Sequence, residues 1–208
     1  MRMRFAGKVN GDKFEGYPTT GTITDYFGRK RSLSGGKAHT GADIANDEGT
    51  PVSAPMPGTV HSVWRAKENP VKNSMEYFFG NCVILRHSDD EDSLIGFTLY
   101  AHFSEPSELS RGDKVDTGDL LGLMGSTGLS TGPHLHWGAS VADNPYLSRS
   151  KGLNDAFDFL DDGEDPGEST PEAVQYDEQQ KRANDLIDAG QSILNDLIDD
   201  LQGKTGDI

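Results

Sequence analysis

This 208-residue chain has one cysteine, Cys82, and no long apolar run. A single thiol cannot close an internal disulfide, and its alternating neighbours in GNCVILR predict that it lies on a strand. No stretch of about 18 consecutive apolar residues occurs, so we predict no membrane span. The N-terminal run MRMRFAGKVNG has two arginines but no apolar core, and we expect it not to be a secretory signal.

Basic residues are also scarce, with 19 Lys and Arg against 34 Asp and Glu, a formal net charge of -15. We therefore expect no nucleic-acid partner. Residues 1–150 carry 18 acidic and 15 basic side chains, whereas 151–208 carry 16 and 4. The run DDGEDPGESTPEA is acidic and rich in Pro, Gly and Ser, which is typical of a solvated linker. This pattern predicts one domain over 1–160 and a linker over 161–176.

A tail over 177–208 follows the predicted linker. Ile and Leu recur at helical spacing between 177 and 202, which predicts an acidic amphipathic helix. An isolated helix of this length is only marginally stable in water, so its apolar stripe is expected to pack against another surface. That surface could belong to the chain's own domain, to a second copy of the chain or to a virion protein.

Before the tail, short alternating runs separated by turn residues predominate, and helical periodicity is scarce. This pattern predicts an all-β fold with an antiparallel β-sheet core. Two long connections, at 28–37 and 65–78, are candidates for setting specificity. The first, GRKRSLSGGK, is basic and could receive substrate carboxylates, although a solvated loop is the favoured interpretation.

Five residues are candidates for chemistry: His39 and Asp43 in HTGAD, His102 in LYAHF, and His134 with His136 in GPHLHWG. Zinc binds imidazole nitrogen and carboxylate oxygen, and a catalytic site uses three protein ligands so that a fourth position stays open for water. Two His and one Asp from this set would therefore suffice for a zinc site.

Strand alternation predicts how the histidines of GPHLHWG are oriented. It places His134 and His136 on one face and Leu135 and Trp137 on the other. The preceding run STGLSTG lacks the strand-to-helix context and the Lys of a phosphate-binding loop. We expect it instead to be the loop that orients His134 and His136.

The same alternation in LYAHF places Tyr100 and His102 on one face and the other residues of the motif in the core. His102 would then lie on the wall of a site. His61 and His87 each follow a strand-like run, but neither has a partner at ligand spacing. We expect these two histidines to be surface or structural residues.

The candidate residues belong to segments that follow one another in a fixed order: ITDYFG (23–28), HTGADIA (39–45), GTPVSAPMPGTV (49–60), GNCVILRH (80–87), TLYAH (98–102) and RGDKVDTGDLLGLMGSTGLSTGPHLHW (111–137). This set resembles the lysostaphin-type, or LytM-like, zinc metallopeptidases, which cut peptide bonds in bacterial cell walls. One His-x-His motif would be weak support, whereas the ordered set is highly specific.

The resemblance implies that His39, Asp43 and His136 bind one zinc ion, while His102 and His134 are unligated catalytic imidazoles. It also implies an antiparallel sheet with a narrow groove whose floor holds the metal. Some relatives lack ligands and only activate other wall enzymes, so an intact set favours hydrolysis.

The expected function is hydrolysis of crosslink or stem peptides in bacterial peptidoglycan. Zinc would polarise the peptide carbonyl and lower the pKa of bound water to roughly 7. His102 and His134 would transfer protons and stabilise the oxyanion, in roles that the sequence does not divide between them. The alternative is a non-hydrolytic wall-binding or virion component that retains the fold.

The expected substrate lies outside the cytoplasm, but the N-terminal run does not resemble a secretory signal. A phage lysin, released by a holin or carried on a virion, is the favoured explanation. A mature fragment of a bacterial protein, or another export route, is the alternative.

Overall fold

The computed structural model describes residues 3–5, 7–30, 36–141, 143 and 153–160, all within one compact unit, Met1–Asp162. The predicted linker (161–176) and tail helix (177–208) lie outside the described residues and stay predictions. None of the helices in the described part of the chain combines the length and the apolar composition that a membrane span requires.

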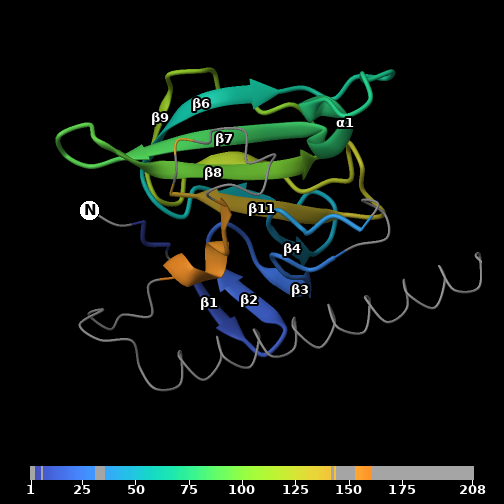
Figure 1. The fold of residues 1–208 in the computed structure, drawn as a ribbon, viewed down its shortest axis with the longest axis horizontal. Coiled ribbons are helices and arrows are strands. Elements are labelled where there is room, and N and C mark those ends of the chain that lie inside the picture. The colour runs from blue at the N-terminus through green and yellow to red at the C-terminus, as the bar shows by residue number, and fades with distance from the viewer. Residues whose placement is uncertain (1–2, 6, 31–35, 142, 144–152, 161–208) are drawn as a thin grey trace, which may run out of the picture. The chain divides into compact units, whose positions relative to one another are not determined.

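A ten-stranded antiparallel sheet forms the body of the unit, as the sequence predicts (Figure 1). The strand order is β1-β2-β3-β4-β11-β8-β7-β6-β9, with β12 paired to β11, while β10 and β5 form a second, two-stranded sheet. The strand bounds are β1 Gly7–Asn10, β2 Lys13–Gly16, β3 Gly21–Asp25, β4 Ala42–Ala45, β5 Pro51–Ser53, β6 Gly58–Trp64, β7 Asn81–Ser88, β8 Leu94–Phe103, β9 Lys114–Val115, β10 Leu120–Leu123, β11 His134–Ser140 and β12 Leu153–Asn154.

Among the described residues, two short helical segments interrupt the strands. Helix α1 (Met75–Phe79) occupies the end of the predicted 65–78 connection, where the side chain of Ser74 caps it by accepting a hydrogen bond from the backbone N–H of Tyr77. The 3-10 helix η2 (Ala156–Phe159) begins at Asp155, whose carboxylate accepts from the backbone N–H of Phe157. Segments this short carry too few residues for helical periodicity to predict them.

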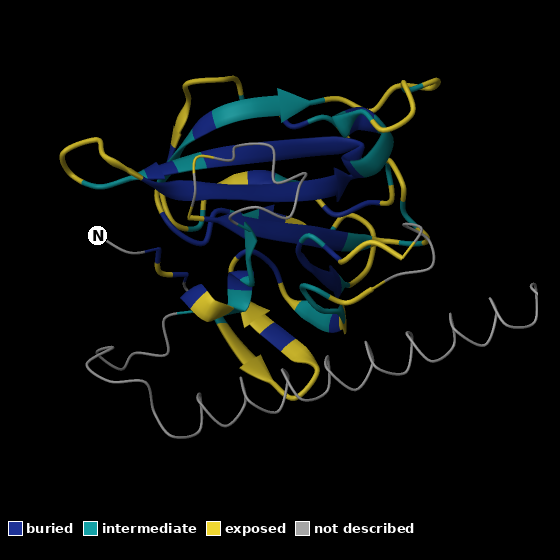
Figure 2. Cartoon of the chain, viewed as in Figure 1, coloured by how far each residue is buried: buried dark blue, intermediate teal, exposed yellow. Residues whose placement is uncertain are grey.

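Apolar side chains cover both faces of the central strands, and Figure 2 shows β7, β8 and β11 almost wholly buried. The larger cluster includes Leu135 and Trp137 of β11 together with Ile44 of β4. Alternate residues of β7 and β8 point to the opposite face. There they form a smaller cluster with α1, made of Phe79, Cys82, Ile84, Phe97, Leu99 and Ala101.

Trp137 anchors the larger cluster directly behind the site face of β11. Its ring contacts Phe5, Phe14 and Phe157, with centroids 5.0, 5.8 and 5.9 Å away. These contacts bind the N-terminal segment, the β1–β2 hairpin and η2 to one side of the sheet. The prediction that Leu135 and Trp137 lie on the opposite face of the strand from His136 is therefore confirmed.

Strand β8 departs from simple alternation where it supplies His102. Between the pairs Asn81–Phe103 and Val83–Tyr100, one residue of β7 faces two of β8, which is a β-bulge. His102 has a φ of 68°, in the left-handed region that non-glycine residues rarely adopt. The extra residue shifts by one position the alternation of side chains between the two faces of β8. The prediction that Tyr100 shares a face with His102 is wrong, because Tyr100 is fully buried in the larger cluster together with Phe103.

The remaining predictions about β7 agree with the structure. Cys82 is a free, buried thiol on the strand. His87 is fully buried, with Nδ1 donating to the carbonyl of Pro57 at 2.8 Å and Nε2 accepting from the hydroxyl of Thr98 at 2.7 Å. Burial lowers the pKa of His87 to about 4, so this ring is a neutral structural residue at neutral pH.

Candidate metal centre and active site

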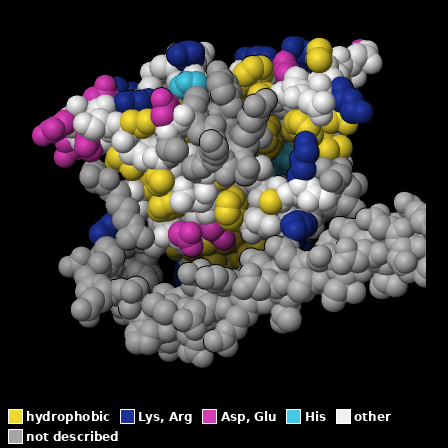
Figure 3. All heavy atoms as spheres, in the orientation of Figure 1, with side chains coloured by type: hydrophobic (Ala, Val, Ile, Leu, Met, Phe, Trp, Pro, Cys, Tyr) yellow, Lys and Arg dark blue, Asp and Glu magenta, His cyan; other side chains and the backbone are white. Residues whose placement is uncertain are grey.

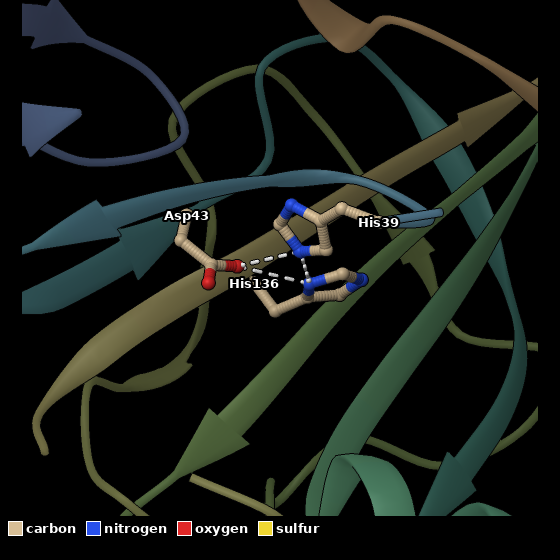
Figure 4. Close-up of side chains that lie close together, drawn as sticks. All are labelled: His39, Asp43 and His136. Carbon is tan, nitrogen blue, oxygen red and sulfur yellow. Dashed lines mark hydrogen bonds and ion pairs between the residues drawn. The ribbon is translucent and has the colours of Figure 1, made fainter. Parts of the chain in front are cut away.

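Three side chains from separate parts of the chain converge on the face of the sheet opposite Trp137. His39 precedes β4, Asp43 lies on β4, and His136 lies directly opposite Asp43 in the β4–β11 register. The Nε2 of His39 is 2.9 Å from the Nδ1 of His136 and 3.1 Å from the Oδ1 of Asp43. The third edge of this triangle, from Asp43 Oδ1 to His136 Nδ1, is 3.0 Å (Figure 4).

The donor set fits a zinc ion. The Nδ1–H of His39 donates to the carbonyl of Tyr26 at 3.1 Å, so its Nε2 presents a lone pair to the triangle. Three ligands at about 2.0 to 2.2 Å from one zinc would lie roughly 3.3 Å apart, close to the observed edges. Within the described residues, His39, Asp43 and His136 are the one group of this kind that could hold a metal.

Burial and neighbouring groups keep Asp43 and His136 in metal-binding form. Each is at most 5% exposed. Burial opposes ionisation of Asp43, but the adjacent rings of His136 and His39 hold the pKa of its carboxyl well below the usual range. Burial lowers the pKa of His136 to about 4. A carboxylate and neutral imidazoles are the species that bind a metal ion.

The turn before β4 fixes His39 through its backbone. The N–H of His39 donates to the carbonyl of Arg29 at 2.8 Å, and the N–H of Gly28 donates to the carbonyl of His39 at 2.9 Å. Gly41 lies against β11 so closely that a Cβ there would be 2.4 Å from the carbonyl oxygen of Trp137. Glycine at 41 therefore allows the HTGAD turn to reach His136.

His102 and His134 lie beside the metal ligands, with their ring centroids 4.6 Å apart. The Nδ1–H of His102 donates to the carbonyl of Thr127 at 2.7 Å, and that of His134 donates to the carbonyl of Gly132 at 2.8 Å. Each ring therefore presents an unprotonated Nε2 when neutral. The predicted loop does orient His134, and it also orients His102, which the sequence did not indicate.

The environments of these two rings differ. His102 is buried, and burial followed by the charges of His134 and His136 lowers its pKa to about 3. The His134 side chain is 13% exposed, and its Nε2 is 3.5 Å from the Oδ2 of Asp43. One ring is thus enclosed and neutral, while the other lies between the metal ligands and solvent.

Several residues that contact the site histidines were not predicted from the sequence. The ring of Phe79 packs against His136 with centroids 5.3 Å apart, and the Oδ2 of Asp25 is 3.8 Å from the Nδ1 of His39. Tyr26 and Thr127 act through backbone carbonyls. Any residue has a carbonyl, so no side-chain pattern could have marked these last two positions.

A cleft of about 550 Å³ opens beside the cluster. Asp43 and His134 line it, together with residues 129–133 of the loop that orients the rings of His102 and His134. Arg29 and Lys30, from the predicted basic connection, line another part of its wall. Residues of the 65–78 connection do not line this cleft.

Comparison with known proteins places this geometry in a family. Residues 37–147, just over half of the chain, match the model of peptidase family M23. The chain belongs to peptidase family M23. The predicted resemblance to lysostaphin-type peptidases is thereby confirmed.

The curated relatives of this M23 chain include proteins named as endopeptidases. It is 37% identical over 109 residues to the DD-carboxypeptidase/endopeptidase Mpg of Neisseria meningitidis, a match covering 52% of this chain and 21% of Mpg. It is 36% identical over 101 residues to the peptidoglycan DD-endopeptidase ShyC of Vibrio cholerae, covering 49% and 20%. The chain thus spans about a fifth of the length of these relatives.

Solved structures show the same fold. The catalytic domain of the antimicrobial peptidase lysostaphin from Staphylococcus simulans matches with a TM-score of 0.53 and 27% identity, covering 66% of this chain and 90% of that domain. A zinc-containing peptidase from Vibrio cholerae matches with a TM-score of 0.50 and 25% identity, covering 70% and 46%.

Proposed function

We propose that this chain is a zinc-dependent endopeptidase that hydrolyses peptide bonds in the crosslinks or stem peptides of bacterial peptidoglycan. One observation carries the proposal. The ligand atoms of His39, Asp43 and His136 lie 2.9 to 3.1 Å apart, with the rings of His102 and His134 beside them. This arrangement combines a three-ligand metal site with two groups that can transfer protons.

The relatives support the substrate class. ShyC is named a peptidoglycan DD-endopeptidase, and Mpg is named a DD-carboxypeptidase/endopeptidase. The solved Vibrio cholerae peptidase is described as containing zinc. The family model spans residues 37–147, which include the segment from His39 to His136, so the part of the chain that defines the family is the part that holds the candidate site.

His39, Asp43 and His136 would hold the zinc. When bound, zinc supplies Lewis acidity to the peptide carbonyl and lowers the pKa of water at its open position. The enclosing smaller cluster, with Phe79 against His136, limits water on the sheet side of the ligands. Reaction would therefore take place on the cleft side, where Asp43 and His134 line the wall.

His102 and His134 are the proposed acid/base and transition-state groups. Their Nδ1–H groups are engaged by backbone carbonyls, so their Nε2 atoms exchange protons with the reacting groups. Between them the two rings accept the proton of the attacking water, stabilise the tetrahedral oxyanion and protonate the departing amine. Burial lowers the pKa of His102 to about 3, so this ring is neutral before the reaction and its Nε2 carries a lone pair.

The non-hydrolytic alternative is disfavoured because the metal ligands and both further imidazoles are present and brought together. The predicted delivery by a phage, through a holin or on a virion, remains part of the proposal.

Digestion of purified peptidoglycan from walls of several chemotypes tests the proposed function. The zinc-loaded protein should release fragments whose new termini, identified by mass spectrometry, show which bond is cut. Chelation should abolish release, and added zinc should restore it. Binding to every wall without release of any fragment, by a protein with one zinc per chain, would instead support the non-hydrolytic alternative.

A further inference from the structure

The wall of the cleft next to the metal centre carries two cations, Arg29 and Lys30. We propose that these side chains form a subsite that binds a carboxylate of the peptide substrate, so that the enzyme prefers acidic peptides over their amidated forms. The inference rests on the proposed function and specifies its substrate class. It concerns a part of the cleft that contains no metal ligand other than Asp43 at its inner end.

Backbone pairing places Arg29 and Lys30 beside the segment that carries the metal ligand His39. The carbonyl of Arg29 accepts from the backbone N–H of His39 at 2.8 Å, and Lys30 forms a β-bridge with Ala38. Gly28, with a φ of 79°, makes the turn that starts this pairing. The base of the basic connection is therefore a short paired segment, which fixes the distance of its first two cations from the site.

Two carboxylates, Asp25 and Asp43, also line the cleft, and both already have partners: Asp25 Oδ1 accepts from the backbone N–H of Tyr26 at 3.0 Å. The carboxylate of Asp43 is committed to His39 and His136. Asp25 contacts Arg29 only at 3.5 Å, and the Arg29 side chain is 65% exposed, so this ion pair is weak. The planar guanidinium retains donors that can bind a carboxylate in a bidentate arrangement.

The densest acidic group in the described chain is remote from the cleft. Figure 3 shows acidic side chains gathered at one end of the molecule, at the tip of the β7–β8 hairpin, where Asp90, Glu91 and Asp92 are exposed. His102 lies at the other end of β8, roughly 25 Å along the strand from that tip. An acidic substrate in the cleft therefore does not meet this group.

The test uses the zinc-loaded full chain and two soluble peptide fragments of peptidoglycan, identical except that one has free carboxyl groups and the other has amides in their place. The wild-type protein should cleave the free-acid peptide with a kcat/KM about tenfold above that of the amide, as expected for a partly exposed charge-assisted hydrogen bond. The Arg29→Gln/Lys30→Gln variant should lose this preference, because its kcat/KM should fall for the free-acid peptide and stay unchanged for the amide.

A Lys8→Gln/Lys13→Gln variant is the matched control, because it removes the same charge from the exposed β1–β2 hairpin and should keep the preference. Isothermal titration of the two peptides gives a second readout that needs no turnover. A protein that binds the acid preferentially but cuts neither peptide would contradict the endopeptidase function and leave the subsite supported. The subsite proposal would be overturned if kcat/KM of the Arg29/Lys30 variant fell equally for both peptides, or if that variant still preferred the free acid.

Discussion

At the scale of single residues, the four histidines of the site differ in which nitrogen remains available. His39 and His136 direct one nitrogen each into the triangle with Asp43. His102 and His134 instead engage Nδ1 with backbone carbonyls and leave Nε2 for a reacting group. Hydrogen bonding thus distinguishes the two proposed ligands from the two proposed proton-transfer groups, although all four are histidines.

Replacing either proton-transfer group should separate metal binding from turnover. His102→Ala and His134→Ala should each lower kcat by on the order of 10² to 10⁴ while one zinc per chain is retained, because neither ring belongs to the ligand triangle. Elemental analysis and rates on the same samples measure both quantities. Loss of zinc from the His102 variant, or full activity of both variants, would show that the roles are misassigned.

The sequence predicted five neighbouring residues, which the structure brings together, because their side chains lie in recognisable motifs. It did not identify Phe79, whose ring packs on His136, since an aromatic residue in a connection has many other uses. It also could not divide roles between His102 and His134, because their burial depends on the loop and strand that enclose them.

At the scale of elements, the loop before β11 couples the two catalytic rings to the sheet. The hydroxyl of Thr127 accepts from the backbone N–H of Asn81 at 3.0 Å and donates to the carbonyl of Phe103 at 2.8 Å. The carbonyl of the same residue accepts from His102. Thr127 therefore ties the orientation of His102 to the ends of β7 and β8.

A Thr127→Val variant should lower kcat by about tenfold with zinc content unchanged, since the ring of His102 loses a fixed acceptor when the loop shifts. Thr127→Ser keeps the hydroxyl and should retain nearly full activity. Steady-state rates and zinc analysis of the two variants make the comparison. A valine variant as active as the serine variant would mean that the loop is held by other contacts.

The bulge at the end of β8 was beyond sequence analysis. Alternation assumes a period of two, and a single extra residue facing β7 reverses the orientation of everything after it. His102 reaches the site because of this insertion and its φ of 68°. The alternation of β11, which has no such insertion in its pairing with β4, was predicted correctly.

The predicted linker and tail lead to an expectation for the shortened chain. A protein ending at residue 160 keeps every described element, so it should bind zinc and cut a soluble peptide at the rate of the full chain. Kinetics, zinc analysis and size in solution test this. A shortened protein that is folded and zinc-loaded but inactive would place the tail in the catalytic machinery. Reduced stability at unchanged size would favour packing of the tail on its own domain.

At the scale of the whole molecule, the buried neutral histidines predict acid sensitivity. His87 has a pKa of about 4 in the folded state against 6.5 in the unfolded chain, so between these values the unfolded state binds a proton that the folded state excludes. The free energy of unfolding should therefore fall as the pH drops from about 6.5 toward 4, by about 2 to 3 kcal/mol for this residue.

Chemical denaturation at several pH values measures this effect. His87→Gln can keep both a donor toward Pro57 and an acceptor for Thr98, so it should reduce the pH slope of stability while remaining folded. Since His102 and His136 stay in place, the difference between wild type and variant isolates His87. Identical slopes in the two proteins would exclude His87 as a source of the acid sensitivity.

The overall architecture was accessible from the sequence because short alternating runs and turn residues specify an antiparallel sheet. The order of strands was not, since β4, β8 and β11 are neighbours in the sheet although they are far apart in the chain. That neighbourhood brings Asp43, His102 and His136 together. The site could be proposed from motifs before the fold was known, but its geometry depends on pairings that no local pattern encodes.

The central claim is that His39, Asp43 and His136 bind one zinc ion, and zinc stoichiometry of single variants tests it most directly. We expect one zinc per chain in the wild type and a large loss in His136→Ala, because two remaining ligands bind zinc weakly. His61→Ala, which changes a histidine outside the site, should keep its zinc. A folded His136→Ala protein that still binds one zinc per chain would contradict the account.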